Sequence, residues 1–314
     1  MSGDRQVEDA TENYDVSMVI PTYRRPQLLE RALKSCIDQT NKLALKFEIV
    51  IVDNCPEKSA LPVVKRLLSE SPIPICYVSE PRPNIALARN AGFANSRAPM
   101  VVFIDDDQEA DADCLDHLVA TQRQFDADAV IGTVEPVFET GSPPPWHHVT
   151  NHCVRRSQLP TGARFRLGRT GNSLIRKDNG KLRSPPFDPA FGHTGSEDLD
   201  FFMHLTKTGG KVVWCGEAVA NEFVGRERAT VRYVARRFFR ESQGYVVCQA
   251  RYSEHPGFTA FYLMFKGLAQ SALWVIPSLL VAPFSFPFAV RAKTRLARGL
   301  GKLFWMKWFR IDHR

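Results

Sequence analysis

Short apolar segments alternate with amphipathic segments along the first third of the chain. The apolar segments, rich in β-branched residues, span residues 16–20, 47–52, 75–78 and 100–104. Apolar residues recur at helical spacing between them, in residues 28–37, 62–69 and 85–95. Short buried strands that alternate with helices predict βαβ units. We therefore expect an α/β fold with a mostly parallel sheet flanked by helices.

Polar residues follow the predicted strands at the point where each strand ends. Thr22 follows the first strand, Asp53 the second, and the acidic run Asp105–Asp107 the fourth. Right-handed crossovers bring the carboxyl ends of parallel strands to one rim, where open α/β folds bind their ligands. Adjacent carboxylates repel one another, and Mg²⁺ or Mn²⁺, which suit oxygen ligands, would relieve that repulsion. The alternative is a solvated acidic turn before a helix that begins near Ala112.

A second acidic pair lies further along the chain. Glu197 and Asp198 follow Ser196 and precede an apolar set at helical spacing that ends before Gly209. Ser196 suits a helix N-cap, and acidic residues in the first turn interact favourably with the helix dipole. We therefore expect a helix N-terminus here, which is compatible with a chemical role for either carboxylate.

The last part of the chain differs from the rest in charge. Residues 226–314 hold 16 Lys and Arg against 4 Asp and Glu, whereas the first 225 residues hold 25 against 30. Residues 231–249 form a basic amphipathic segment, and 24 uncharged residues separate Lys266 from Arg291. That length is enough for a membrane-spanning helix, but three prolines interrupt it. We expect a helical region that associates with an anionic membrane, either by spanning the bilayer or by lying in its surface.

The alternative for this basic end is a buried helical pair that packs on the preceding domain. Nucleic acid also attracts positive charge, but no nucleic-acid-binding motif accompanies it, so we expect no nucleic-acid partner.

The seven cysteines are scattered and form no CxxC pair, which favours reduced thiols in the cytoplasm. Residues 1–14 are polar and lack the apolar segment of a secretory signal, so we expect a disordered tail. The expected location is the cytoplasm, at the inner face of the cell membrane.

Five motifs in a fixed order make the chain resemble the family 2 glycosyltransferases, inverting enzymes with the GT-A fold. They are VSMVIPTYRRPQLLERALKS, IVIVDN, NIALARNAG, VVFIDDD and GSEDLDFFMHLTKTGGKVVW. The resemblance covers residues 16–223 and is greatest to bacterial enzymes that extend exopolysaccharides or other surface glycans. It implies a GT-A catalytic domain at 15–225, between the tail at 1–14 and the basic, apolar helical region at 226–314.

The resemblance also implies a binding site for a nucleoside diphosphate sugar. The loop expected around the base and ribose contains Pro21, Thr22, Tyr23 and Arg24. Asp53 would accept a hydrogen bond from the base, as expected for uracil. Arg89 and Asn90 would contact the nucleotide or its diphosphate.

The acidic residues have implied roles in the metal site and in catalysis. Asp105 would face the ribose and, with Asp107, hold Mn²⁺ or Mg²⁺, while Asp106 has no definite role. Of Glu197 and Asp198, Asp198 is expected to be the base that takes the proton of the acceptor hydroxyl. Many relatives carry a metal-binding His where this chain offers Asn221, which leaves fewer protein ligands.

These implications together predict an inverting, metal-dependent glycosyltransferase. The expected donor is a UDP-sugar, and the expected acceptor is a glycan, such as a polyprenyl-linked oligosaccharide. Two alternatives stay open at this point. One is a nucleotidyltransferase on a related sheet, for which the Gly-rich basic loop after the first strand is missing. The other is a non-catalytic nucleotide-sugar-binding or membrane scaffold protein of the same fold.

Overall fold

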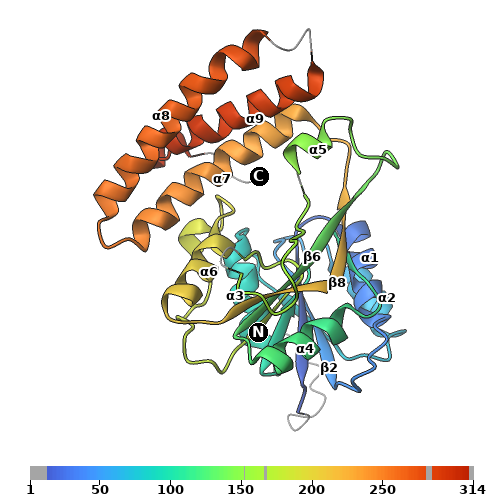
Figure 1. Ribbon diagram of the computed structural model, residues 1–314. Helices are drawn as coiled ribbons and strands as arrows, with labels where there is room; N and C mark the ends of the chain where they lie inside the picture. The colour runs from blue at the N-terminus through green and yellow to red at the C-terminus, as the bar shows by residue number, and fades with distance from the viewer. Residues whose placement is uncertain (1–12, 152, 166–167, 281–284, 311–314) are drawn as a thin grey trace.

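The computed structural model describes residues 13–151, 153–165, 168–280 and 285–310 and has the predicted α/β fold (Figure 1). Eight strands form one sheet in the order β3-β2-β1-β4-β7-β6-β8-β5. Their bounds are β1 (Val16–Thr22), β2 (Phe47–Asp53), β3 (Ile75–Ser79), β4 (Met100–Phe103), β5 (Gln108–Ala110), β6 (Ala129–Phe138), β7 (Ser173–Arg176) and β8 (Val212–Val224). The first four strands run parallel, whereas β7 is antiparallel to both of its neighbours.

The helices include the three that the periodicity of the first third predicts. Their bounds are α1 (Pro26–Ile37), α2 (Leu61–Leu68), α3 (Ile85–Asn95), α4 (Cys114–Phe125), α5 (His147–Thr150), α6 (Glu197–Lys207), α7 (Val231–Arg251), α8 (Pro256–Leu280) and α9 (Phe286–Leu303). Two short 3₁₀ helices, η1 (Pro189–Phe191) and η2 (Lys307–Phe309), lie among them.

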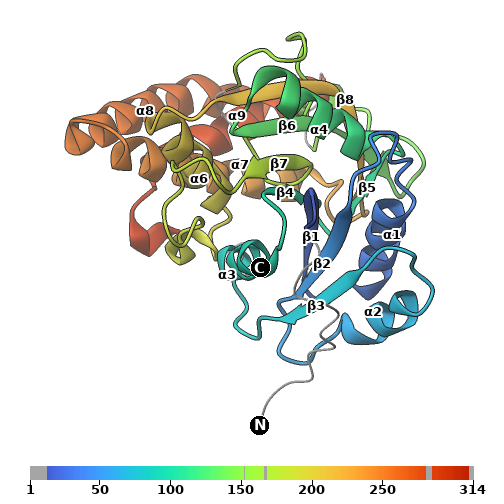
Figure 2. The ribbon, with the colours of Figure 1, turned by 90° about the horizontal axis from the view of Figure 1, so that it is seen from below.

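Helices cover both faces of the sheet, and each face has its own apolar core. One core joins α1, α2 and α4 to strand residues such as Met18 and Ile20. The other joins α3 and α6 to Val19 and Phe103. Alternate residues of β1 thus point to opposite faces, as the pleat of a strand requires. Figure 2 shows α1 and α2 on one side of the sheet and α3 on the other.

The register of the parallel strands brings the predicted polar ends to one rim. Thr22 pairs with Asp53 at the ends of β1 and β2. Val19 pairs with Phe103, so the acidic run that follows β4 lies level with the end of β1. The rim therefore collects residues from three strands, as the topology predicts.

The second half of the sheet departs from the prediction. The short apolar segment at residues 212–214 predicts only the start of β8, which continues to Val224, and no predicted strand covers β6. Gly132 and Pro136 weaken the strand pattern of β6, because both residue types are depleted in strands. The pairing of β6 with β8 also shifts register between Gly132 and Thr133.

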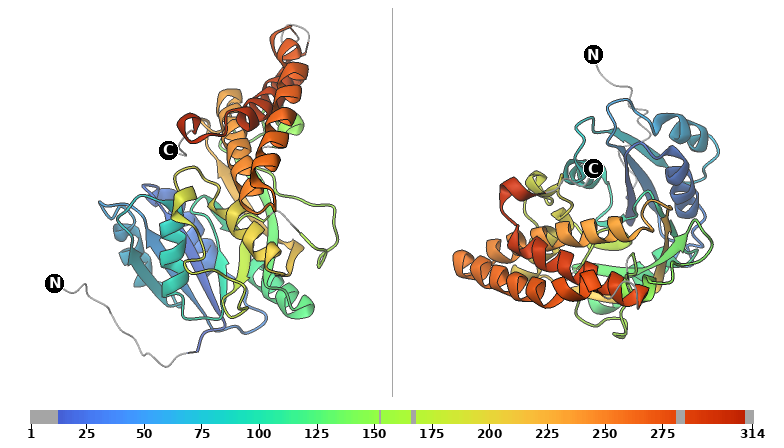
Figure 3. Two further views of the ribbon diagram at one scale, coloured as in Figure 1. Left: turned by 90° about the vertical axis from the view of Figure 1, so that its left-hand side faces the viewer. Right: turned by 90° about the horizontal axis from the view of Figure 1, so that it is seen from above.

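The C-terminal helices α7, α8 and α9 stack beside one another over one end of the sheet (Figure 3). A Cβ added at Gly267 of α8 would lie 2.7 Å from the carbonyl oxygen of Gly299 in α9, so these two helices approach closely. Pro277 lies within α8 without ending it. In the part of the chain that the structure describes, no helix has the length and hydropathy needed to cross a membrane.

The N-terminal segment is more ordered at its end than the sequence predicts. Residues 1–12 lie outside the described residues, but Tyr14 is buried, with the Arg97 guanidinium 4.4 Å from its ring centre. This cation–π contact ties the start of β1 to the segment after α3. The predicted tail at 1–14 is thus too long at its C-terminal end.

We predict that Asn84→Ala lowers the free energy of unfolding by about 1–2 kcal/mol, because it removes an N-cap. The Asn84 side chain accepts hydrogen bonds from the backbone N–H groups of Ala86 and Leu87, and it donates to the carbonyl of Pro189. Urea denaturation measures the change. Asn95→Ala, at the exposed end of the same helix, is the matched control and should change stability by less than about 0.5 kcal/mol. Equal effects of the two substitutions would contradict the capping role.

Candidate active site

A cavity of about 1200 Å³ lies between the rim of the sheet and the C-terminal helices. The ends of β1 and β4 and the N-terminus of α6 line one side, and α7 and α9 line the other. Pro21, Thr22 and Tyr23 face this cavity together with the acidic run after β4. The cavity also contains Glu197 and Asp198, so the two acidic clusters that are far apart in sequence share one space.

The acidic run is held in place by arginines and by the end of β1. Thr22 donates a hydrogen bond of 2.9 Å to Asp106, and Arg25 contacts Asp106 at 3.2 Å and Asp107 at 3.3 Å. Burial raises the pKa of the Asp106 carboxyl to about 6, although the charge of Arg25 opposes the shift. Asp106 therefore ties the acidic turn to β1, and Asp107 is the carboxylate between two arginines.

The second of these arginines comes from the segment after β8. Arg228 bonds Asp107 at 2.6 Å and also pairs with Glu222. Glu222 faces the cavity, whereas the neighbouring Asn221 donates a hydrogen bond of 2.6 Å to Asp111. Asn221 is thus not at the site, because successive side chains of a strand point to opposite faces. Arg25, Glu222 and Arg228 are site residues that the sequence analysis missed.

Arg89 connects the two acidic clusters. This buried residue of α3 contacts Asp105 at 3.3 Å and forms an ion pair with Glu197. Burial raises the pKa of Glu197 to about 7, and the charge of Arg89 opposes that shift. Burial also raises the pKa of Asp105, and the charge of Asp107 adds to the effect. A single guanidinium therefore partly neutralises one carboxylate from each cluster.

Asp198 lies in the first turn of α6 and lines the cavity. One of its oxygens accepts a hydrogen bond of 2.7 Å from the backbone N–H of Leu199. Ser196 occupies the N-cap position as predicted, but its side chain makes no capping hydrogen bond. Instead it packs against Gly244 of α7, where an added Cβ would lie 1.8 Å from the Ser196 hydroxyl. The α6 N-terminus is thus enclosed by α7.

Three residues expected at the nucleotide lie outside the cavity lining. Arg24 is exposed and pairs with Glu57 at 2.8 Å. The Asp53 carboxylate accepts hydrogen bonds from two backbone N–H groups and from Tyr77, which fixes the loop after β2. Asn90 bonds both backbone groups of Phe187 and so supports the segment before α6. In place of contact with the cavity, all three side chains thus bond to neighbouring parts of the protein.

Asp105 and Asp107 have the donor chemistry for a divalent cation. Among the described residues, no three or more His, Cys, Asp or Glu converge as a metal site. Mg²⁺ usually takes one or two protein carboxylates and completes its coordination with substrate phosphates and water. The two carboxylates therefore fit a cation that binds together with a diphosphate.

We predict a pH dependence of stability that arises from Glu197. Its ordinary pKa of 4.5 is raised to about 7 in the folded state, so the folded protein binds more protons between these values. The free energy of unfolding should therefore fall as pH rises from about 4.5 to about 7, by up to about 3 kcal/mol from this group. Urea denaturation across this range should show a smaller fall in the free energy of unfolding for Glu197→Gln than for wild type. The fall that remains would come from Asp106, whose pKa is also raised by burial. Identical slopes for the two proteins would contradict the assignment.

Comparisons with known proteins agree with this geometry. The model of the glycosyl transferase family 2 matches residues 17–184. The succinoglycan biosynthesis protein ExoM of Rhizobium meliloti is 34% identical over 234 residues, which is 74% of each chain. Among solved structures, residues 1–349 of S. aureus TarS match with a TM-score of 0.55 at 15% identity, over 90% of each chain. A structure of the same protein in complex with UDP-GlcNAc matches with a TM-score of 0.52 at 14% identity, again over 90% of each.

The structural similarity identifies the GT-A fold, and the sequence matches identify the family. The family match sets aside the nucleotidyltransferase and the non-catalytic scaffold as alternatives. The chain belongs to glycosyl transferase family 2 and is a glycosyltransferase enzyme related to those that build exopolysaccharides and other surface glycans.

Proposed function

We propose that the enzyme transfers a sugar from a UDP-sugar to a hydroxyl of a lipid-linked surface glycan, with inversion at the transferred carbon. The observation that carries the proposal is the single cavity lined by Asp105–Asp107 and by Asp198, with Arg89 between them. A relative named for succinoglycan biosynthesis supports a glycan product. The similar fold of S. aureus TarS in its complex with UDP-GlcNAc supports a uridine nucleotide as the donor carrier.

The donor diphosphate would bind at the acidic turn and its arginines. Thr22 and Tyr23 would line the nucleotide end, while Arg25 and Arg228 would exchange part of their contact with Asp107 for phosphate oxygens. A Mn²⁺ or Mg²⁺ ion held by Asp105 and Asp107 would act as a Lewis acid for the departing diphosphate. The paired arginines would stabilise the same developing charge, since they are already ordered by the carboxylates.

Asp198 would act on the opposite side of the sugar. Its carboxylate would take the proton of the acceptor hydroxyl as that oxygen attacks the sugar carbon and the diphosphate leaves. Attack and departure on opposite faces invert the configuration in a single displacement, as in inverting glycosidases. Glu197, paired with Arg89, would hold the first turn of α6 in position rather than move a proton.

We predict that Asp198→Asn lowers the rate of transfer by about 10²–10⁴-fold, the usual contribution of a general base. The assay is UDP release from a panel of UDP-sugars in the presence of a membrane extract as acceptor source. UDP affinity should change by less than about twofold, and EDTA should abolish wild-type turnover until Mn²⁺ or Mg²⁺ is added back. Asp178→Asn, an exposed aspartate after β7, is the matched control. Turnover of Asp198→Asn equal to that of wild type would remove Asp198 from the mechanism.

The outer face of α8 supports attachment to the inner face of the cell membrane. Its exposed apolar residues recur at helical spacing, and they include Phe258, Phe261, Tyr262, Phe265, Leu268, Leu273, Ile276 and Leu279. Phe258, Phe261 and Leu279 are 71%, 68% and 72% exposed. A continuous apolar face of this size is unusual on a protein surface that contacts only water. Arg291 and Lys293 on α9 are exposed nearby and would favour anionic headgroups.

We propose that α8 lies in the membrane surface with its apolar side toward the lipid, since amphipathic helices bind in this way. Phe261→Ser with Phe265→Ser should weaken binding to phosphatidylglycerol vesicles at least tenfold, because each buried Phe contributes about 1.5–3 kcal/mol. Vesicle sedimentation measures the change. Leu68→Ser with Leu159→Ser removes two exposed apolar side chains elsewhere and is the matched control. Unchanged sedimentation of the Phe variant would contradict attachment through α8.

A further inference from the structure

The side of the cavity opposite the acidic clusters is strongly basic. We call it the basic wall, and it consists of Arg169, Arg237, Arg240, Arg295, Arg298 and Lys302. The α7 and α9 helices supply all of these residues except Arg169. Glu241 is the acidic residue among them, and it pairs with Arg169 and Arg237 at 2.9 Å each. The Glu241 carboxylate thus pairs with two of the six cations of the basic wall.

The other four cations of the basic wall have no carboxylate partner within the described ranges: Arg240, Arg295, Arg298 and Lys302. Neutral groups hold two of them. The Arg298 guanidinium lies 3.9 Å from the centre of the Phe238 ring, and Lys302 donates a hydrogen bond of 2.8 Å to Gln270. Burial lowers the pKa of Lys302, and the charge of Arg298 lowers it further. Like charges gathered at a cavity wall are costly, and a bound anion would relieve that cost.

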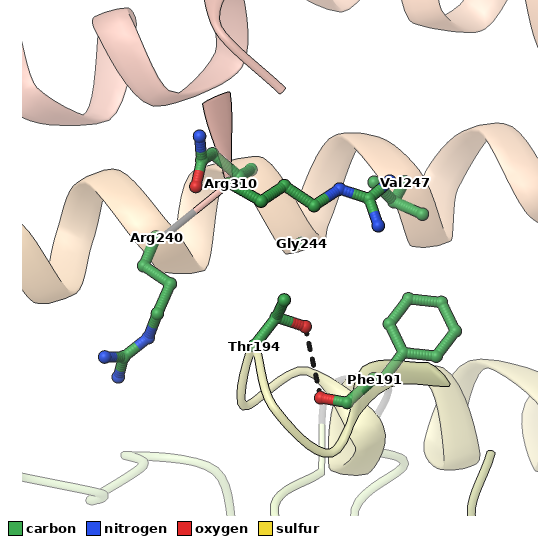
Figure 4. A pocket seen from close by; sticks show the side chains of 7 residues that line it. Phe191, Thr194, Arg240, Gly244, Val247 and Arg310 are labelled. Atoms are coloured by element: carbon green, nitrogen blue, oxygen red, sulfur yellow. Dashed lines mark hydrogen bonds between the residues drawn. The ribbon is translucent and has the colours of Figure 1, made fainter. Parts of the chain in front are cut away.

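Arg240 lies between the basic wall and the loop that precedes α6, the helix that carries the proposed catalytic base Asp198. It lines the main cavity and also a small pocket between α7 and the segment of Phe191 and Thr194. Figure 4 shows its side chain extending from α7 toward the level of this segment, in which the Thr194 hydroxyl donates to the Phe191 carbonyl. The chain then continues into α6, which begins at Glu197. An anion at the basic wall would therefore lie beside the segment that leads into the helix that carries Asp198, across the cavity from the acidic clusters.

We propose that the basic wall binds the diphosphate of the acceptor, which joins its lipid to its glycan. This inference rests on the proposed function, because it assigns a site to the acceptor of that reaction. In the proposed function the donor diphosphate binds at Arg25 and Arg228, which pair with Asp106 and Asp107, so the basic wall would be a second anion site in the same cavity. Arginine binds phosphate oxygens through paired N–H groups, which suits a diphosphate.

The position of α9 explains why a lipid-linked diphosphate fits better than a soluble one. Arg298 and Lys302 lie on the side of α9 that faces the cavity, and α8, with its exposed apolar face, packs on α9 through Gly267 and Gly299. Figure 1 shows α8 outermost among the three C-terminal helices. A molecule with an apolar tail, a diphosphate and a sugar would thus meet an apolar surface, cations and Asp198 in that order.

The test measures binding of farnesyl diphosphate, a short prenyl diphosphate, by titration calorimetry with the donor site filled by UDP and Mg²⁺. Arg240→Gln with Arg298→Gln should raise its Kd at least tenfold, because hydrogen bonds to charged groups are lost. Arg236→Gln is the matched control, since Arg236 is exposed on α7 and lies outside the cavity lining. Its Kd should stay within twofold of wild type. Farnesol, which lacks the diphosphate, should bind the double variant as it binds wild type.

Several results would overturn the proposal. One is an unchanged Kd for farnesyl diphosphate in the double variant. Another is an equal loss of affinity for UDP, which would assign the basic wall to the donor. A third is an equal loss of binding to phosphatidylglycerol vesicles, which would assign it to membrane headgroups. Should the double variant not fold by circular dichroism, Lys302→Gln replaces it with the same expected direction. Wild type that binds farnesyl diphosphate but releases UDP from no UDP-sugar would contradict the proposed transfer from a UDP-sugar, while the basic wall would still be a binding site for a prenyl diphosphate.

Discussion

The buried guanidinium of Arg89 is the interaction on which the arrangement of the cavity depends. It contacts Asp105 from one acidic cluster and Glu197 from the other, and α3 holds it there through the cap formed by Asn84. Breaking a buried ion pair by removing one partner typically costs about 3–5 kcal/mol, because a charge is left without compensation. The two acidic clusters are therefore joined electrostatically as well as by the fold, and a change of charge in one cluster affects the other.

The resemblance of the sequence to the family implies that the two acidic clusters belong to one site, and both line the same cavity. It does not predict which neighbouring side chain faces the cavity. Arg24 has a backbone φ of 55°, and this turn directs Arg25, not Arg24, toward Asp106 and Asp107. Both arginines are equally suited by type, so only the backbone conformation distinguishes them. Of the predicted loop, residues 21–23 line the cavity, and Arg25 rather than Arg24 lines it beside them.

The other differences between the predicted and the observed structure also have local physical causes. Glu222 faces the site and Asn221 does not, because β8 extends past Trp214 and keeps its alternation. β8 is extended because it pairs with β6 along its length. Gly132 and Pro136 make β6 difficult to recognise as a strand in the sequence. In the C-terminal region the excess of positive charge and the apolar stretch are evident in the sequence. Their separation into a basic wall facing inward and an apolar face outward requires the packing of α7, α8 and α9.

The contact between Gly244 and Ser196 has a mechanical consequence. With no space for even one additional carbon atom, α7 rests directly on the first turn of α6. A helix that rests on another in this way transmits displacement, so a tilt of the C-terminal helices would shift Asp198 as well. Force applied to the outer helices would thus reach the N-terminus of α6, and the rigidity of this joint limits how far the Asp198 carboxylate can move.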